Sequence, residues 1–168
     1  MKKIFYILLM LIGLNSTHSN AQSKTSFTKE DAALLSGSWK GSLTYLDYNS
    51  GKPYTMPANT NINLIRGMNS LLIEMIYPDE PKANSKDTIK INEDRTSFDG
   101  ALIISRKSLT DGSVQIITEL NGKDGNANKN ALLRKTYTFS KNSFTNRKDV
   151  QFEGTNVWIK RHEYSYTR

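Results

Sequence analysis

Residues 37–45 read GSWKGSLTY, and the alternation in this stretch decides the fold. One face carries Trp39, Gly41, Leu43 and Tyr45, whereas the other face carries lysine, serines and a threonine. A period of two is typical of an antiparallel strand that buries one face and exposes the other. The stretch therefore predicts a first strand whose apolar face has to be covered by further strands.

Working outward from this strand, the chain supplies a series of alternating segments separated by short turns. No segment between them has a convincing helical period, so parallel crossovers are not expected and the sheet is predicted to be antiparallel. We predict an all-β fold, an up-and-down meander of about 8–10 strands closed into a barrel, with a sandwich as the less favoured alternative. The further strands are expected at residues 59–66, 70–77, 87–91, 96–105, 113–120, 131–139, 143–152 and 157–167.

Several connections are predicted from turn chemistry. Pro53 and Pro57 lack the N–H that a ladder needs, so regular pairing after the first hairpin is expected to resume only at Asn59. Gly100, in the middle of a strand, predicts a bulge or bend. Residues 121–130 consist almost wholly of Asn, Gly, Lys and Asp, which predicts a long, exposed and mobile loop.

The N-terminal region divides into a leader and a short helical segment. Residues 1–21 contain Lys2-Lys3, an apolar run and a small-residue end, which is the layout of a secretory signal cleaved after Ala21. In residues 22–34, Thr28 and Asp31 stand at the spacing of a capping box and predict one or two turns of helix. Residues 35–168 form the predicted barrel domain. The protein is accordingly expected to be exported, periplasmic or secreted, with no transmembrane segment after signal removal.

Composition excludes several classes of protein. The chain has no cysteine, so neither disulfides nor a cysteine-linked lipid anchor is available. Its net charge of +7 falls to +5 when Lys2 and Lys3 leave with the leader. The basic residues are scattered rather than gathered in one stripe, which favours a solvated surface over a nucleic-acid interface. About 147 mature residues suffice for one core, and we expect a monomer.

A helical turn, Gly37-Ser38-Trp39 at the start of the first strand and a long meander together resemble the lipocalin-like, or calycin, proteins, and also small exported bacterial proteins of unknown function. In that family the tryptophan closes the base of the barrel under an arginine from the last strands. The resemblance therefore implies that Trp39 has this role and that Arg161 or Arg168 packs on it.

Candidate chemical groups are few. His162 is the only histidine after the leader and is a candidate haem or metal ligand, but an ordinary strand residue is the expected role because no second ligand stands at metal spacing. Asp124 begins a pattern of alternate oxygen side chains like a calcium loop, which then fails at Lys129 and Lys135. We expect no metal and no cofactor.

Catalytic residues are not identified either. Paired carboxylates, Glu74 with Glu119 or Asp99 with Asp111, would be an acid and a base only if they met. The chain has no cysteine and no serine in a nucleophile elbow. We expect the protein not to be an enzyme.

Two functions of different kinds remain. The first is a binding protein for a small apolar or amphipathic ligand, held inside the barrel by Tyr45, Met75, Tyr77 and Tyr137. The second is an interaction or inhibitor protein of the cell envelope, with a filled barrel, that acts through its loops. The volume of the interior distinguishes them, because ligand cavities typically measure several hundred cubic ångströms.

Overall fold

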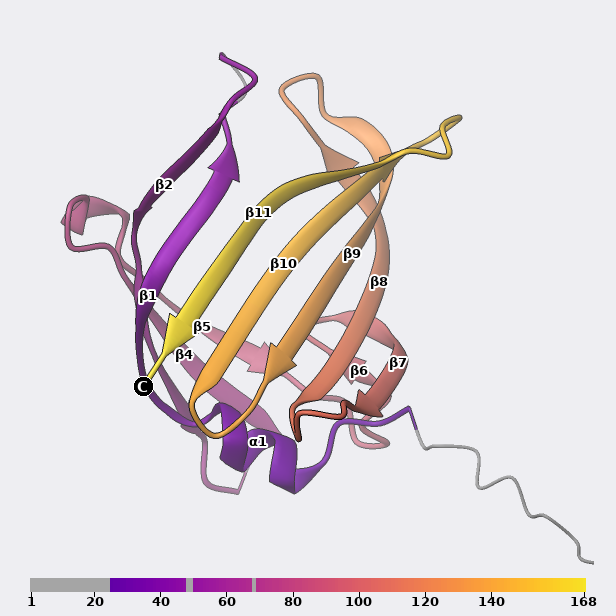
Figure 1. Cartoon of the computed structure of the whole chain (residues 1–168). Coiled ribbons are helices and arrows are strands. Elements are labelled where there is room, and N and C mark those ends of the chain that lie inside the picture. The colour runs from indigo at the N-terminus through magenta and orange to yellow at the C-terminus, as the bar shows by residue number, and fades with distance from the viewer. Residues whose placement is uncertain (1–24, 48–49, 68) are drawn as a thin grey trace, which may run out of the picture.

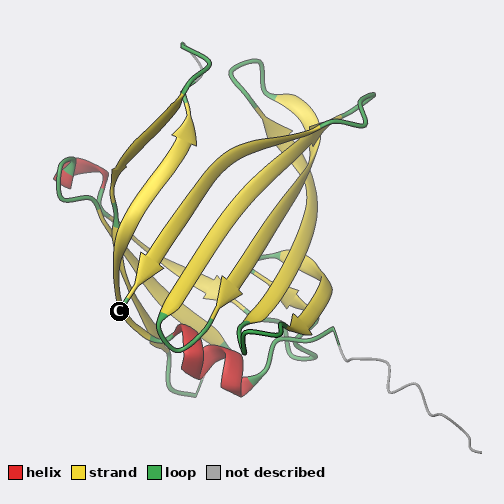
Figure 2. Ribbon diagram, in the orientation of Figure 1, coloured by secondary structure: helices red, strands yellow, loops and turns green. Residues whose placement is uncertain are grey.

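The computed structural model describes residues 25–47, 50–67 and 69–168, which form one curled antiparallel sheet with a short helix beneath it (Figures 1 and 2). The predicted leader lies outside the described residues. The elements are α1 (Lys29–Leu35), β1 (Gly37–Leu46), β2 (Pro53–Pro57), β3 (Asn59–Leu64), β4 (Ser70–Ile76), the 3-10 turn η1 (Pro81–Ala83), β5 (Ser85–Lys90), β6 (Ser97–Phe98), β7 (Ala101–Ser108), β8 (Val114–Asp124), β9 (Lys129–Phe139), β10 (Ser143–Phe152) and β11 (Trp158–Thr167).

The strands follow one another around a nearly closed barrel. Their order is β5-β4-β3-β1-β11-β10-β9-β8-β7-β6, with β2 paired to β1 alone. The two ends of the sheet meet at one antiparallel bridge between Ile91, just after β5, and Phe98 of β6. This confirms the predicted all-β antiparallel meander and the barrel rather than the sandwich.

Three connections differ from the sequence predictions. The long loop predicted at residues 121–130 is wrong, because β8 and β9 stay paired up to Asp124 and Lys129 and leave only residues 125–128 as the turn. This end of the hairpin contributes little to the core, so its residues are polar on both faces and show no alternation.

The strand predicted at residues 96–105 is interrupted. Asp99 and Gly100 have φ of 55° and 72° and form a two-residue turn between β6 and β7, where Phe98 pairs with Ala101. Of the bulge or bend predicted at Gly100, the bulge is therefore wrong and the chain bends sharply instead, which an Asp-Gly hairpin signal accounts for.

The expectation that pairing resumes only at Asn59 is also wrong. Residues 53–57 form β2, which pairs with β1 from Ser42↔Pro57 to Leu46↔Pro53. Since β2 pairs with no other strand, each proline tolerates its missing N–H at an edge position.

The helix α1 closes the lower end of the barrel. Thr28 and Asp31 form the predicted capping box, and Asp31, fully buried, also accepts two hydrogen bonds from Arg106 of β7. At the other end of the helix, the Leu35 carbonyl accepts the indole N–H of Trp39 at 2.8 Å. Polar contacts thus join helix and sheet at both ends of α1.

Trp39 is buried at the base of the barrel, as predicted. Its ring contacts Phe144, and the guanidinium of Arg168 lies 3.8 Å from the ring centroid while donating to the carbonyls of Leu34 and Ser36. Of the two arginines that the resemblance proposes, Arg168 is therefore the one that packs on Trp39. Nearby, β1 and β11 approach so closely that a Cβ on Gly41 would lie 1.9 Å from the Ser165 carbonyl oxygen, which requires glycine there.

Candidate functional site

The strand register assigns the residues of β8–β11 to the inner or the outer face. Paired residues of an antiparallel ladder point to the same face, and Phe139, Phe144 and Tyr166 belong to the buried core. Side chains alternate along a strand, so the residues two and four positions away from each of these, toward the end of the barrel opposite α1, also face inward. On this face, Lys135 and Lys148 pair with each other and Lys148 pairs with His162.

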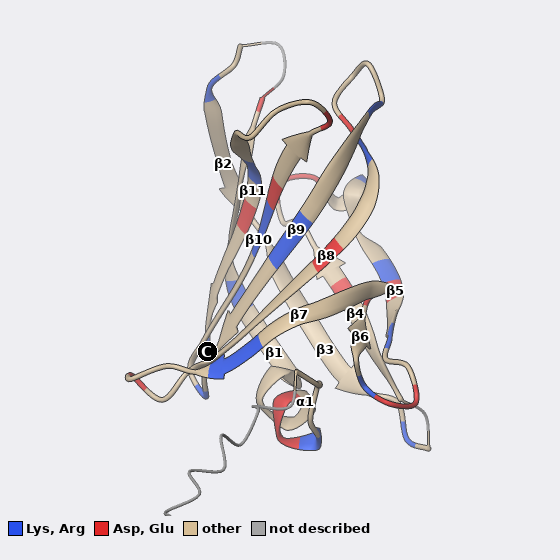
Figure 3. Ribbon diagram, turned by 90° about the vertical axis from the view of Figure 1, so that its right-hand side faces the viewer, with Lys and Arg blue, Asp and Glu red and all other residues tan. Residues whose placement is uncertain are grey.

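Charged residues of these four strands are confined to the half of the barrel away from α1, which we call the upper half (Figure 3). In the lower half, the strands read VQIIT in β8, TYTF in β9, SFTN in β10 and YSYT in β11, without a single charge. The interior therefore has an apolar base and an ionised upper part.

Two groups of ion pairs occupy the inner face of the upper half. Lys135 Nζ lies 2.6 Å from Asp99. Asp124 lies between Lys148, at 3.1 Å, and Arg161, at 2.6 Å, and the side chains of Asp124 and Arg161 are about nine-tenths buried. Burial opposes ionisation of Asp124, but hydrogen bonds from Arg161 and Lys148 outweigh it and lower the pKa of this carboxyl. On the inner face of β8–β11 themselves, three cations stand against one carboxylate, Asp124, and leave this face cationic, whereas Asp99 and Asp87 come from the β6–β7 turn and from β5.

His162 faces inward by alternation from Tyr166, and an irregularity in the ladder follows directly after it. The register between β10 and β11 shifts after Lys148↔His162, so that the next pair is Asp149↔Lys160 and Arg161 is the extra residue. Strict alternation would put Lys160 on the same face as His162, but the shift places Lys160 on the outer face, where it contacts Glu163. Burial, followed by repulsion from Lys148 and Lys135, lowers the pKa of His162 from 6.5 to about 4.

Below these charges, the interior is nearly filled. A cavity of about 110 Å³ lies there, lined mainly by apolar side chains, with Asn146, Asp99 and Asp87 as polar members. The Oδ1 atom of Asn146 and the Oγ1 atom of Thr118 are buried and have no hydrogen-bond partner among the described residues. Because such atoms normally find partners, there is a place here for water or for a polar group of a ligand.

The four residues predicted to line one ligand space lie in different surroundings. Tyr137 is buried, packs edge-on against Phe98 and lines the 110 Å³ cavity. Met75 and Tyr77 reach across the barrel to β11, where the Tyr77 and Tyr164 hydroxyls lie 2.9 Å apart and the Tyr166 hydroxyl lies 4.0 Å from the Met75 sulfur.

Tyr45 lies on the inner face near the upper end of β1, paired with His162 on one side and Tyr54 on the other. Its ring contacts the ring of Tyr54, which is 52% exposed. Leu120 also faces inward, through its pairing with Leu133, and is 47% exposed. The upper interior therefore presents apolar side chains as well as cations.

The sequence reasoning missed Lys135, Lys148 and Arg161 as parts of a site. Lys135 and Lys148 stand at core-face positions of strands whose other ends are apolar, so the period of two could have revealed them. Arg161 could not be found in this way, because the irregularity that turns it inward reverses the alternation of β11.

The other candidate groups have separate partners. Glu74 pairs with Lys86, Glu119 with Arg134, and Asp111 accepts hydrogen bonds from Ser113, so neither proposed carboxylate pair comes together. Within the described residues, no three His, Asp or Glu side chains are grouped to hold a metal. The described part of the chain also contains no helix that is long and apolar enough to cross a membrane.

Comparison with known proteins assigns no family. No protein-family model matches the chain, and no curated protein matches it. Among solved structures, the crystal structure of Rv2717c from M. tuberculosis aligns with a TM-score of 0.49 and 12% identity, covering 83% of this chain and 95% of that chain. The resemblance to lipocalin-like proteins remains a prediction.

Proposed function

We propose that this protein is an exported binding protein, rather than an enzyme, for a small amphipathic molecule with an anionic group. The ligand occupies the upper interior, with its anionic group near Lys135, Lys148 and His162 and its apolar part against Tyr54 and Leu120. The observation that carries the proposal is the group of partly buried cations on the inner face of β8–β11, beside the half-exposed Tyr54 and Leu120.

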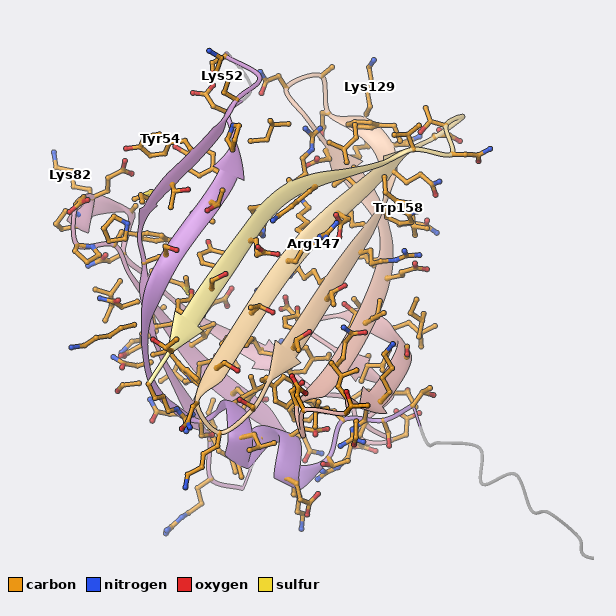
Figure 4. All side chains as sticks on the ribbon, in the orientation of Figure 1. Lys52, Tyr54, Lys82, Lys129, Arg147 and Trp158 are labelled. Carbon is orange, nitrogen blue, oxygen red and sulfur yellow. The ribbon has the colours of Figure 1, made fainter. Side chains whose placement is uncertain are left out.

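The packed base limits the ligand. A cavity of about 110 Å³ lies below the range of about 300–1,000 Å³ that small-molecule sites usually occupy. The ligand therefore does not extend to the base of the barrel. Tyr137, chosen from the sequence as a direct contact, can touch only a small polar end of the ligand. Lys52, in the turn between β1 and β2, and Lys129, the first residue of β9, lie at the open end, and Lys82 lies in η1 to one side, where Asp79 and Glu80 precede it (Figure 4). These cations favour the approach of an anion.

A fluorescent fatty acid and its uncharged methyl ester test this proposal as a pair of probes. The acid is expected to bind the mature protein with micromolar affinity and more tightly than the ester, because charge-assisted hydrogen bonds contribute about 1.5–3 kcal/mol. Lys148→Gln is expected to weaken binding of the acid about tenfold and to leave the ester unaffected. Lys40→Gln, on the exposed outer face of β1, is the matched control.

A second function, an interaction protein that acts through its loops, is supported by the nearly filled lower interior. The tips of the β8–β9 and β10–β11 hairpins enclose a hollow of about 430 Å³ that includes Asn126, Lys129 and Glu153. If neither probe binds and native mass spectrometry of the exported protein reveals a bound protein partner, this second function replaces the first.

A further inference from the structure

The strongest unassigned feature is a groove at the lower end of the molecule, outside the barrel. It has a volume of about 570 Å³ and lies between the start of α1, the turn after β3 and the segment that follows β5. This volume falls within the range of small-molecule sites and exceeds the cavity inside the barrel. We call it the basal groove.

The floor of the basal groove is apolar. Phe27 and Ala32 are buried beneath it, and Ile91 adds a further apolar side chain. Leu64 also lines the groove and is 56% exposed, although it is the last residue of a strand that buries Ile62. An exposed leucine beside a concave apolar surface is typical of a place where the apolar part of a ligand binds.

The walls of the basal groove are cationic. Lys29, Arg66 and Arg95 line it from three separate segments, and none of the described residues in its lining is acidic. Asp94, in the same turn as Arg95, accepts hydrogen bonds from Thr96 and is not part of the lining.

The arginines make the argument specific. Arg106, Arg134, Arg147 and Arg161 each pair with a carboxylate, and Arg168 donates to two carbonyls. Among the described residues, the two arginines whose side chains have no hydrogen bond or ion pair are Arg66 and Arg95, and both line the basal groove. A planar guanidinium without a partner is a ready donor to a carboxylate or phosphate.

The segment that carries Arg95 is held in position. The Arg95 carbonyl accepts a hydrogen bond from the Phe27 N–H at 2.9 Å, and the Arg95 N–H donates to the Asn92 carbonyl. Arg95 also has a φ of 61°, which is uncommon for a residue other than glycine. The turn is therefore fixed against the floor of the groove.

We propose that the basal groove binds a single anionic amphiphile, with its apolar part on Phe27 and Leu64 and its carboxylate or phosphate between Arg66 and Arg95. The site is separate from the upper interior and does not depend on the proposed function. Its concave shape favours a dissolved molecule over a flat membrane surface.

Octyl phosphate and octanoate, below the concentrations at which they aggregate, are suitable anionic probes, with octanol as the uncharged probe. In an NMR titration of the full mature protein, both anions are expected to shift backbone signals around Phe27, Leu64 and Arg95. Arg66→Gln and Arg95→Gln are each expected to weaken binding about tenfold. Lys141→Gln, an exposed cation at the same end of the barrel, is expected to change the affinity read from these signals less than twofold.

Three results would overturn the proposal: octanol binding as tightly as the anions, affinity unchanged in both arginine variants, or binding only to vesicles of anionic phospholipid. A thermal unfolding curve matched to the wild type shows that each variant is folded. Leu64→Asn leaves every cation in place. It is expected to weaken the binding of octyl phosphate more than the binding of inorganic phosphate. Equal weakening of both would contradict the assigned apolar contact.

Discussion

The lower and upper halves of the barrel interior are built from the same four strands, β8–β11, yet their chemistry is opposite. The lower half buries Trp39, Phe139, Phe144 and Tyr166 with no charge on these strands, whereas the upper half places Lys135, Lys148 and Arg161 on the inner face. Burying a charge costs free energy even when the charge is paired. The lower half therefore supplies the stability, and the upper half carries groups whose presence stability alone does not explain.

The largest expected effect lies in the lower half, where Trp39→Ala removes a ring that is 1% exposed. We expect the free energy of unfolding to fall by about 3–5 kcal/mol, the range for truncating a large buried aromatic residue. Chemical denaturation measures this loss. Trp158→Ala is the comparison, because Trp158 is partly exposed and only its ring face is covered, by Arg134. A loss below about 1 kcal/mol for Trp39→Ala would refute the organising role of β1.

Arg106→Met tests the contact that joins α1 to the barrel. It leaves the fully buried Asp31 without its cation, and such a change costs roughly 2–4 kcal/mol. Lys86→Met removes a cation from the exposed pair with Glu74, where about 0–1 kcal/mol is expected. If denaturation midpoints show equal losses for the two variants, burial of Asp31 does not govern the attachment of α1.

The sequence predicted the lower half far better than the upper half. Trp39, the capping box of Thr28 and Asp31, and most strand positions followed from alternation and turn chemistry, since these patterns arise from burial on one face. In the tip of the β8–β9 hairpin both faces are polar, so the same reasoning predicted a loop at residues 121–130 where strands continue.

The candidate site was predicted less well for a related reason. The choice of Tyr45, Met75, Tyr77 and Tyr137 assumed that aromatic and apolar residues mark a ligand cavity, but the contacts of Met75 and Tyr77 across the barrel fill that space. Ion pairs such as Lys148 with Asp124 join distant strands, and a single sequence gives no sign of that pairing.

The next largest expected effect concerns His162, on the inner face of the upper half. In the folded protein it takes up a proton near pH 4, and in the unfolded chain near pH 6.5. Between these values the unfolded chain binds more protons, so the free energy of unfolding falls as the pH falls from 6.5 to 4. With allowance for partial exposure, this loss is about 2 kcal/mol.

His162→Gln is expected to remove that share of the pH dependence. Denaturation of the wild type and the variant is measured between pH 4 and 7. The difference between their free energies of unfolding is expected to change by about this amount between pH 7 and pH 4. Parallel curves over the whole range would show that His162 does not stay neutral beside Lys135 and Lys148 in the folded protein.

The smallest expected effect is at the border between the two halves, where Tyr77 and Tyr164 meet. Burial, followed by the hydrogen bond with Tyr77, raises the pKa of Tyr164, so this hydroxyl remains neutral at physiological pH. Tyr77→Phe removes one hydroxyl and leaves the Tyr164 hydroxyl without this partner, which costs about 1 kcal/mol. Because the ring remains, the packing of the lower half is preserved and binding of a fluorescent fatty acid in the upper interior should change less than threefold. A much larger loss of binding would move the ligand site down to the border, whereas unchanged stability would mean that water replaces the hydrogen bond and that the upper interior is wet down to Tyr164.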